Sequence, residues 1–220
     1  MTIADEPVSA DIVALLDGCT STSKMLAEQE EGPYRHGEQP RRRDVTDGCR
    51  GSPFRLGLRL HTQGGDAAIG VDVEIWHCDP QGRYSGYPPN DPAIAVDPSA
   101  QPAEYLPDET FLRGRQTTDA AGDVEFRTIY PGWYPGRTVH IHLMVHMPDR
   151  SYTSQLYFPE DVTSVVFAQD PYRDHGLPNT THASDGIFAT GGDPAVFDIR
   201  TDARGRVGVL CLVLPGHAAP

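Results

Sequence analysis

The chain has 220 residues, which is enough to bury a substantial core in one all-β or mixed domain with long loops. Apolar residues make up 38% and charged residues 22% of it, a globular composition that excludes an intrinsically disordered chain. The net charge of -13 disfavours binding to nucleic acid or to an anionic membrane surface, and no stretch is apolar enough to span a bilayer.

The N-terminal sequence and the cysteines bear on the compartment in which the chain works. The apolar run 12–16 is too short, and too closely flanked by acidic residues, to be a secretory signal. We therefore expect a cytoplasmic protein, with secretion as the alternative. The cysteines include no CxxC pair, which argues against a zinc knuckle or a thioredoxin-like site; they are Cys19, Cys49, Cys78 and Cys211. Reduced thiols are the default expectation, whereas their even number would allow disulfides in a secreted chain.

Two regions follow one another along the chain. Residues 1–29 are predicted to be a short helical segment, because their apolar side chains follow a loose helical spacing that Gly18 and a polar stretch interrupt. Residues 30–220 are predicted to form a single β domain. It begins with residues 30–47, a polar, turn-rich stretch expected to be an irregular loop. The basic run Arg41–Arg43 in this loop is expected to be a solvated surface patch.

From Pro53 onward, apolar and polar residues alternate in short stretches separated by turn residues. The stretches lie at 54–60, 71–75, 124–128, 139–143, 156–158 and 207–214. Because no helical periods separate them, they predict an all-β fold, an antiparallel sandwich or barrel, and argue against parallel βαβ units. Two Pro- and Asp-rich connections, 85–111 and 163–193, are longer than ordinary loops and are candidates to cover a site.

The most informative motif is the pair His140 and His142 in the run YPGWYPGRTVHIHLMVH. In a strand both side chains project from one face while Ile141 projects from the other, so two imidazoles converge as metal ligands do. Such a pair alone is more often an ordinary surface feature than a metal site. No acidic residue follows closely, which argues against an Fe(II) facial triad or a cupin-like site. A zinc site of His140, His142 and His146 stays open.

Tyrosine-containing motifs surround this pair, in a fixed order along the chain. The segments are EGPY at 31–34, RRDVTDG at 42–48, VDVEIWHCDPQGRYSGY at 71–87, FLRGRQTTDAAGDVEFRTIYPGWYPGRTVHIH at 111–142 and SQLYF at 154–158. Together they resemble the intradiol ring-cleavage dioxygenases, the non-haem Fe(III) enzymes related to protocatechuate and catechol dioxygenases. The fold of that family is a β-sandwich, so we predict an antiparallel β-sandwich with long loops and a short helical N-terminal segment.

The resemblance implies a metal centre and an activity. Non-haem Fe(III) would be bound by residues at four matching positions, namely Tyr84, Tyr134, His140 and His142. The reaction implied is cleavage of a catechol with O2 to a cis,cis-muconate. Tyr134 would leave the metal and accept a substrate proton, and Arg137 would stabilise developing negative charge. Gln155 matches a further site position of the family.

Partners and alternatives follow from departures from the family pattern. Residues 1–29 are shorter than the helical segment through which catechol dioxygenases dimerise, so the expected partners are a catechol-type substrate and O2, with a homo-oligomer left open. The alternative function is a non-catalytic sandwich module that binds aromatic or carbohydrate ligands, for which Tyr87 and Tyr105 are candidate exposed aromatics. His77 is predicted to be structural.

Overall fold

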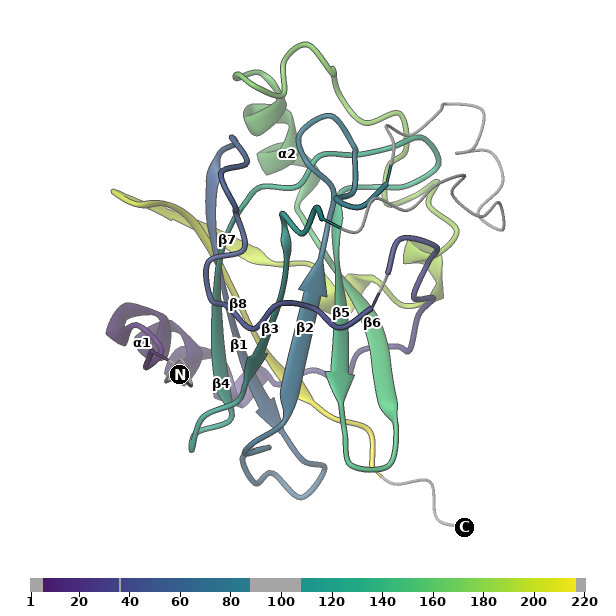
Figure 1. The fold of residues 1–220 in the computed structure, drawn as a ribbon. Coiled ribbons are helices and arrows are strands. Elements are labelled where there is room, and N and C mark those ends of the chain that lie inside the picture. The colour runs from purple at the N-terminus through teal and green to yellow at the C-terminus, as the bar shows by residue number, and fades with distance from the viewer. Residues whose placement is uncertain (1–5, 36, 88–107, 217–220) are drawn as a thin grey trace.

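The chain folds as two four-stranded β-sheets packed face to face, as Figure 1 shows for the computed structural model. The structure describes residues 6–35, 37–87 and 108–216. Tyr105 and most of the long connection 85–111 lie outside the described residues. Within the described ranges, no helix has both the length and the apolar character needed to cross a membrane.

Sheet A contains strands β4, β1, β8 and β7 in that order, and sheet B contains β3, β2, β5 and β6. The strands are β1 (Pro53–His61), β2 (Asp72–Trp76), β3 (Arg113–Thr117), β4 (Asp123–Ile129), β5 (His140–His146), β6 (Ser151–Tyr157), β7 (Asp198–Asp202) and β8 (Gly205–Val213). The α-helices are α1 (Ala10–Cys19) and α2 (Glu160–Phe167), and short 3-10 turns lie at Thr20–Thr22, Phe188–Thr190 and Asp193–Ala195. The prediction of a mainly β sandwich with a short N-terminal helix is confirmed.

The alternating pattern of β1 places one face of sheet A in the core. Leu56 and Leu58 are fully buried in the main apolar cluster, to which both sheets contribute. The alternate residues of the strand, Arg55, Gly57 and Arg59, face the opposite side, where Arg59 forms a two-point ion pair with Asp123. Burial of one face therefore follows directly from the two-residue period of the strand.

One strand pair departs from the antiparallel prediction. β1 and β8 run parallel, with Leu56 opposite Gly208, whereas the other strand pairs are antiparallel. The two strands do not form a βαβ unit, because all the other strands lie between them along the chain. The chain passes through both sheets between β1 and β8, so β8 can enter sheet A in the same direction as β1.

Helix α1 covers the outer face of sheet A. Its buried residues Ile12 and Leu16 pack against Val207 of β8, and the helix lies beside β1 and β8 in Figure 1. A Cβ on Gly57 of β1 would lie 2.6 Å from Ile12 Cγ2, so a side chain there would push the helix away. The small residue in β1 therefore permits the close contact between helix and sheet.

A disulfide links the end of this helix to the last strand. Cys19 and Cys211 are bonded, with 5.9 Å between their Cα atoms. The expectation of reduced thiols is therefore wrong for this pair, because the packing of α1 on β8 places the two cysteines at bonding distance. Cys49 and Cys78 are free thiols.

In the basic run Arg41–Arg43 only Arg41 is exposed as expected, and each of the three arginines has a specific partner. The Arg41 guanidinium contacts Asp72 with both nitrogens, at 3.0 and 2.7 Å. Arg42 donates hydrogen bonds to two backbone carbonyl oxygens. Arg43 lies 3.6 Å from the buried carboxylate of Glu125. Each of the three cations thus attaches the entry loop to strands of the sandwich, and the expectation of free surface charges is wrong.

Candidate metal centre

The HxH motif lies on the outer face of sheet B, in β5. Ile141 packs into the core between the sheets, so the histidines on either side of it point away from that core, as the strand alternation predicts. The strand register places His142 between Trp76 of β2 and Gln155 of β6. The Trp76 ring stacks on the His142 ring, with 4.8 Å between centroids and 3° between planes. Both His140 and His142 are buried.

Two loops bring tyrosines to these histidines. Tyr84 lies in the loop that follows β2, and Tyr134 lies in the PGWYPG turn between β4 and β5. A Cβ on Gly82 would lie 2.2 Å from the carbonyl oxygen of the residue before Tyr134, and one on Gly132 would lie 2.0 Å from that of Asp79. Because only glycine tolerates such approaches, the two loops interlock and hold their tyrosines together.

The donor atoms of the four side chains converge. His140 Nε2 lies 3.1 Å from His142 Nε2 and 3.3 Å from Tyr134 Oη. Tyr84 Oη lies 3.1 Å from His142 Nε2 and 3.5 Å from His140 Nε2. Four donors that bind one ion at about 2.0 to 2.1 Å in a tetrahedron are separated by roughly 3.3 Å. The observed separations therefore fit a single metal ion.

The orientation and charge of His140 suit a metal ligand. Its Nδ1 must donate to the carbonyl oxygen of Thr138, at 2.7 Å, which leaves Nε2 with a free lone pair. Burial and the nearby Arg137 charge lower the pKa of His140 to about 3, so the ring is neutral. Burial and the His140 ring hold the pKa of His142 well below its usual range as well. Two neutral Nε2 atoms 3.1 Å apart repel unless a proton or a cation lies between them.

The two phenols are protonated in the metal-free chain. Burial raises the pKa of Tyr84 well above that of free tyrosine and raises the pKa of Tyr134 as well. A multivalent cation at the point where the donors converge would reverse this preference, because it favours phenolate over phenol.

His146 lies on the same face of β5 but takes no part in the cluster. Its Nε2 is 2.9 Å from Glu74 Oε2, and its Nδ1 is 3.2 Å from Ser151 Oγ. Among the described residues, no three His, Cys, Asp or Glu side chains are placed to hold a metal. The three-histidine zinc site is therefore wrong, because the buried Glu74 carboxylate holds His146 and the positions completing the cluster are tyrosines.

An aromatic wall and a glycine cover the donors. Tyr34 stacks on Tyr84, with 4.5 Å between centroids, and meets Tyr87 edge-on at 5.4 Å. Tyr87 is only 7% exposed, so the expectation that it is an exposed aromatic residue available to bind a ligand is wrong. Gly32 has a φ of +73°, and a Cβ there would lie 3.3 Å from His142 Cε1. The EGPY segment therefore passes directly over the site.

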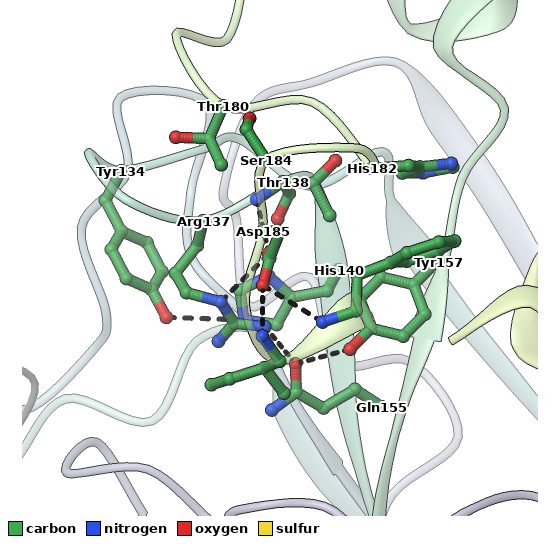
Figure 2. Close-up of polar contacts among 12 residues, drawn as sticks. Tyr134, Arg137, Thr138, His140, Gln155, Tyr157, Thr180, His182, Ser184 and Asp185 are labelled. Carbon is green, nitrogen blue, oxygen red and sulfur yellow. Dashed lines mark hydrogen bonds and ion pairs between the residues drawn. The ribbon is translucent and has the colours of Figure 1, made fainter. Parts of the chain in front are cut away.

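Arg137 and Gln155 meet beside His140, as the close-up in Figure 2 shows. Arg137 Nη1 lies 3.5 Å from His140 Nε2, and Nη2 donates to Gln155 Oε1. The Tyr157 hydroxyl donates to the same oxygen, at 3.2 Å. Asp185 Oδ2 accepts from Arg137 Nε at 3.0 Å. Asp185 was missed in the sequence, where the only signal was that the connection 163–193 could cover a site.

Two other histidines act by packing. His77 is fully buried, with Nε2 2.7 Å from Thr128 Oγ1, which agrees with its predicted structural role. His175 donates from Nε2 to the carbonyl oxygen of Trp133 at 2.9 Å. It thereby ties the connection 163–193 to the turn that carries Tyr134.

A sequence model of a protein family described as "Dioxygenase" matches residues 30–175, which is more than half of the chain. The chain belongs to the intradiol ring-cleavage dioxygenase family. The matched segment includes all four converging donors, but it ends before Asp185.

Solved members of this family share the architecture. An intradiol ring-cleavage dioxygenase from Tetranychus urticae is 28% identical, with a TM-score of 0.76 over 86% of this chain and 94% of that chain. The dioxygenase domain of a dioxygenase carbohydrate-binding protein fusion from Streptomyces sp. SirexAA-E is also 28% identical, with a TM-score of 0.61 over 87% and 98%.

A curated relative is more distant. Chlorocatechol 1,2-dioxygenase from Rhodococcus opacus is 25% identical over 143 residues, a match that covers 56% of this chain and 47% of that protein. The chain therefore spans about half the length of this relative.

The interlocked loops of this intradiol dioxygenase family member give a first testable prediction. Gly132→Ala should lower the free energy of unfolding by about 1 to 3 kcal/mol, because the methyl group has no space against the Asp79 carbonyl. It should also weaken metal binding, since it separates the loops of Tyr84 and Tyr134. Urea unfolding and metal content per chain measure the two effects. Gly18→Ala is the control, because its Cβ meets nothing within 4 Å. Equal losses in both variants would contradict the interlock.

Proposed function

We propose that this chain is an Fe(III)-dependent intradiol dioxygenase, which uses O2 to cleave a catechol-type diol to a cis,cis-muconate-type product. The observation that carries the proposal is the convergence of two phenol oxygens and two imidazole nitrogens from Tyr84, Tyr134, His140 and His142. Buried polar groups crowded in this way are costly unless something satisfies them together. An ion bound by all four satisfies them at once.

The donor set suits a ferric ion. A free phenol has a pKa of about 10, so a neutral tyrosine is a poor ligand for a weakly charged metal. A trivalent ion can hold both phenols as phenolates, which offset two of its three charges, while two neutral imidazoles add no charge. When bound, Fe(III) supplies the redox chemistry by which a coordinated diol reacts directly with O2.

Tyr134 is the residue that we assign to move a proton. Its phenolate oxygen would accept the proton of a substrate hydroxyl and so act as a general base. The packing of the two tyrosines supports this division of roles. Tyr84 is fully buried beneath the Tyr34 ring, whereas Tyr134 is 8% exposed and lies on the side of Arg137. Tyr84 is therefore assigned to stay in place.

Arg137 is assigned to stabilise negative charge that develops on the diol. Its guanidinium lies within 3.5 Å of a ligand nitrogen and is itself buried, so its field is poorly screened by water. Gln155 orients this group by accepting from Nη2, and its own amide donates to the carbonyl oxygen of Glu30 at 3.1 Å. Glu30 directly precedes the EGPY segment, so the chain that leads over the site also holds Gln155 and, through it, the arginine.

The colour of the iron-loaded protein is the sharpest test. Two phenolates bound to Fe(III) should give a red-brown charge-transfer band, which neither zinc nor a His/carboxylate Fe(II) centre produces. Anaerobic catechol should shift the band to longer wavelength, because a more electron-rich ligand joins the metal. In air, catechol, hydroxyquinol or protocatechuate should yield a muconate-type absorbance. A colourless protein replete with iron, or no product from any of the three diols, would contradict the proposal.

A further inference from the structure

A carboxylate beyond the matched family segment reaches the centre of the site. Asp185 lies in the connection that follows α2, and it is only 1% exposed. In Figure 2 it lies beside Arg137, on the side away from Tyr134. A buried carboxylate in an acidic protein needs compensating partners, because taking its charge out of water is expensive.

Four donors hold Asp185 in one orientation. Oδ2 accepts from Arg137 Nε at 3.0 Å and from the Thr138 amide at 2.8 Å. Oδ1 accepts from the amides of Ile187 and Phe188, at 2.8 and 3.0 Å. One oxygen thus contacts the loop of Arg137 and the other contacts its own connection. The carboxylate is a fixed charge rather than a mobile one.

The positive charge of Arg137 is unfavourable beside a bound metal ion, and the Asp185 carboxylate compensates it. The guanidinium is buried and lies 3.5 Å from His140 Nε2, one of the proposed ligands. A buried cation so close to a ferric site repels the metal in a medium that screens charges poorly. Gln155 can orient the guanidinium but carries no charge. Asp185 supplies the compensating charge, because its Oδ2 lies 3.0 Å from Arg137 Nε.

We propose that Asp185 is a positioning residue, which fixes the direction of the Arg137 guanidinium and compensates its charge so that a ferric ion and a bound diol can share the site. This inference rests on the proposed function. The hydrogen-bond partners of the Asp185 carboxylate are Arg137 and three backbone amides, and none of them is one of the four converging donors. It acts through Arg137, and its effect should disappear when Arg137 is absent.

A purely structural role is the competing explanation, because Asp185 also accepts from two amides of its own connection. The neighbouring Ser184 offers a matched control. Its Oγ accepts from the Thr181 amide at 2.9 Å, so the hydroxyl is bonded within its own connection and not to Arg137. Ser184→Ala should therefore loosen the connection without changing the electrostatics of the arginine.

The test is a double-mutant cycle with Asp185→Asn, Arg137→Gln and the double variant, all as iron-loaded protein. In the wild-type background, Asp185→Asn should lower kcat/KM for catechol by about 100-fold, because the charged Arg137 side chain is then misplaced. In the Arg137→Gln background, the same substitution should lower kcat/KM by less than about 3-fold. It should also weaken anaerobic catechol binding, measured from the band shift. Asp185→Glu should recover part of both losses, and Ser184→Ala should change neither.

The outcomes separate the two proposals. An equal loss of kcat/KM on Asp185→Asn in both backgrounds, with a coloured and active wild type, would overturn the positioning role alone. A colourless, inactive wild type would overturn the proposed function and this inference with it. If Asp185→Asn fails to fold, Asp185→Glu carries the test. An equal loss of catechol affinity on Asp185→Glu with Arg137 present and with Arg137→Gln would then overturn the role.

Discussion

His142→Ala and His140→Ala should each yield a folded protein that retains less than stoichiometric iron, shows no charge-transfer band and does not cleave catechol. Each substitution removes one of four protein donors, and each of these donors lies 3.1 to 3.5 Å from at least one other. Because loss of a residue that only supports a ligand lowers metal affinity by about 10- to 100-fold, loss of a ligand should cost at least about 100-fold. Metal analysis after gel filtration and the visible spectrum measure the effect.

The same strand offers the control for this prediction. His146 lies on the same face of β5 but contacts Glu74 and Ser151 instead of the donor cluster. His146→Ala should keep both iron and colour. Loss of iron from His146→Ala together with its retention in His142→Ala would contradict the donor assignment.

Removal of the disulfide should have the largest effect on stability. Cys19→Ser should lower the free energy of unfolding by about 3 to 5 kcal/mol, because the bond joins residues 192 positions apart and so restricts the unfolded chain strongly. The loss should be largest at the helix, which contacts sheet A through a small apolar cluster around Ile12 and Leu16 and through two ion pairs with arginines of β1. Urea unfolding with and without a reducing agent measures the change.

Matched variants give the disulfide prediction its controls. Cys49→Ser removes a free, half-buried thiol and should leave the dependence on reductant unchanged. Cys19→Ser should make the midpoint independent of reductant. A wild type with the same urea midpoint in oxidising and reducing buffer would contradict the stabilising role.

The sequence was sufficient to predict that His140 and His142 share one face of a strand, because a local rule decides it. A strand with two-residue periodicity points His140 and His142 to one face whatever the rest of the fold does. The tyrosines were found through the resemblance, since no periodicity links Tyr84 to a strand 56 residues further on. Their meeting depends on two interlocked loops, whose glycines carry no signal of their partners.

The strands that were missed are polar and lie at sheet edges. β3 (RGRQT) and β7 (DIRTD) lack apolar alternation, because each pairs with a single neighbouring strand and contributes little to the core. The parallel direction of β8 could not be predicted, because it depends on contacts between the two ends of the chain. Local pattern rules contain no information about such contacts.

Charged residues were the weakest part of the sequence interpretation. Arg41–Arg43 reads as a surface patch because basic runs usually are solvated, yet each arginine meets a distant partner. Asp185 lies in the connection 163–193 among other acidic and polar residues, and nothing in the sequence distinguishes it from them. Only the folded chain shows that one carboxylate in this stretch faces a buried guanidinium.

The central place of β8 in sheet A has a consequence for synthesis of the protein. β8 lies between β1 and β7, and among the strands of the two sheets it is the last to be synthesised. Until then β1, which is buried along nearly its whole length in the finished fold, has a bare edge on the side away from β4. A bare apolar edge pairs readily with other chains. The yield of native protein in a cell therefore depends on how well the nascent chain is shielded before β8 is made.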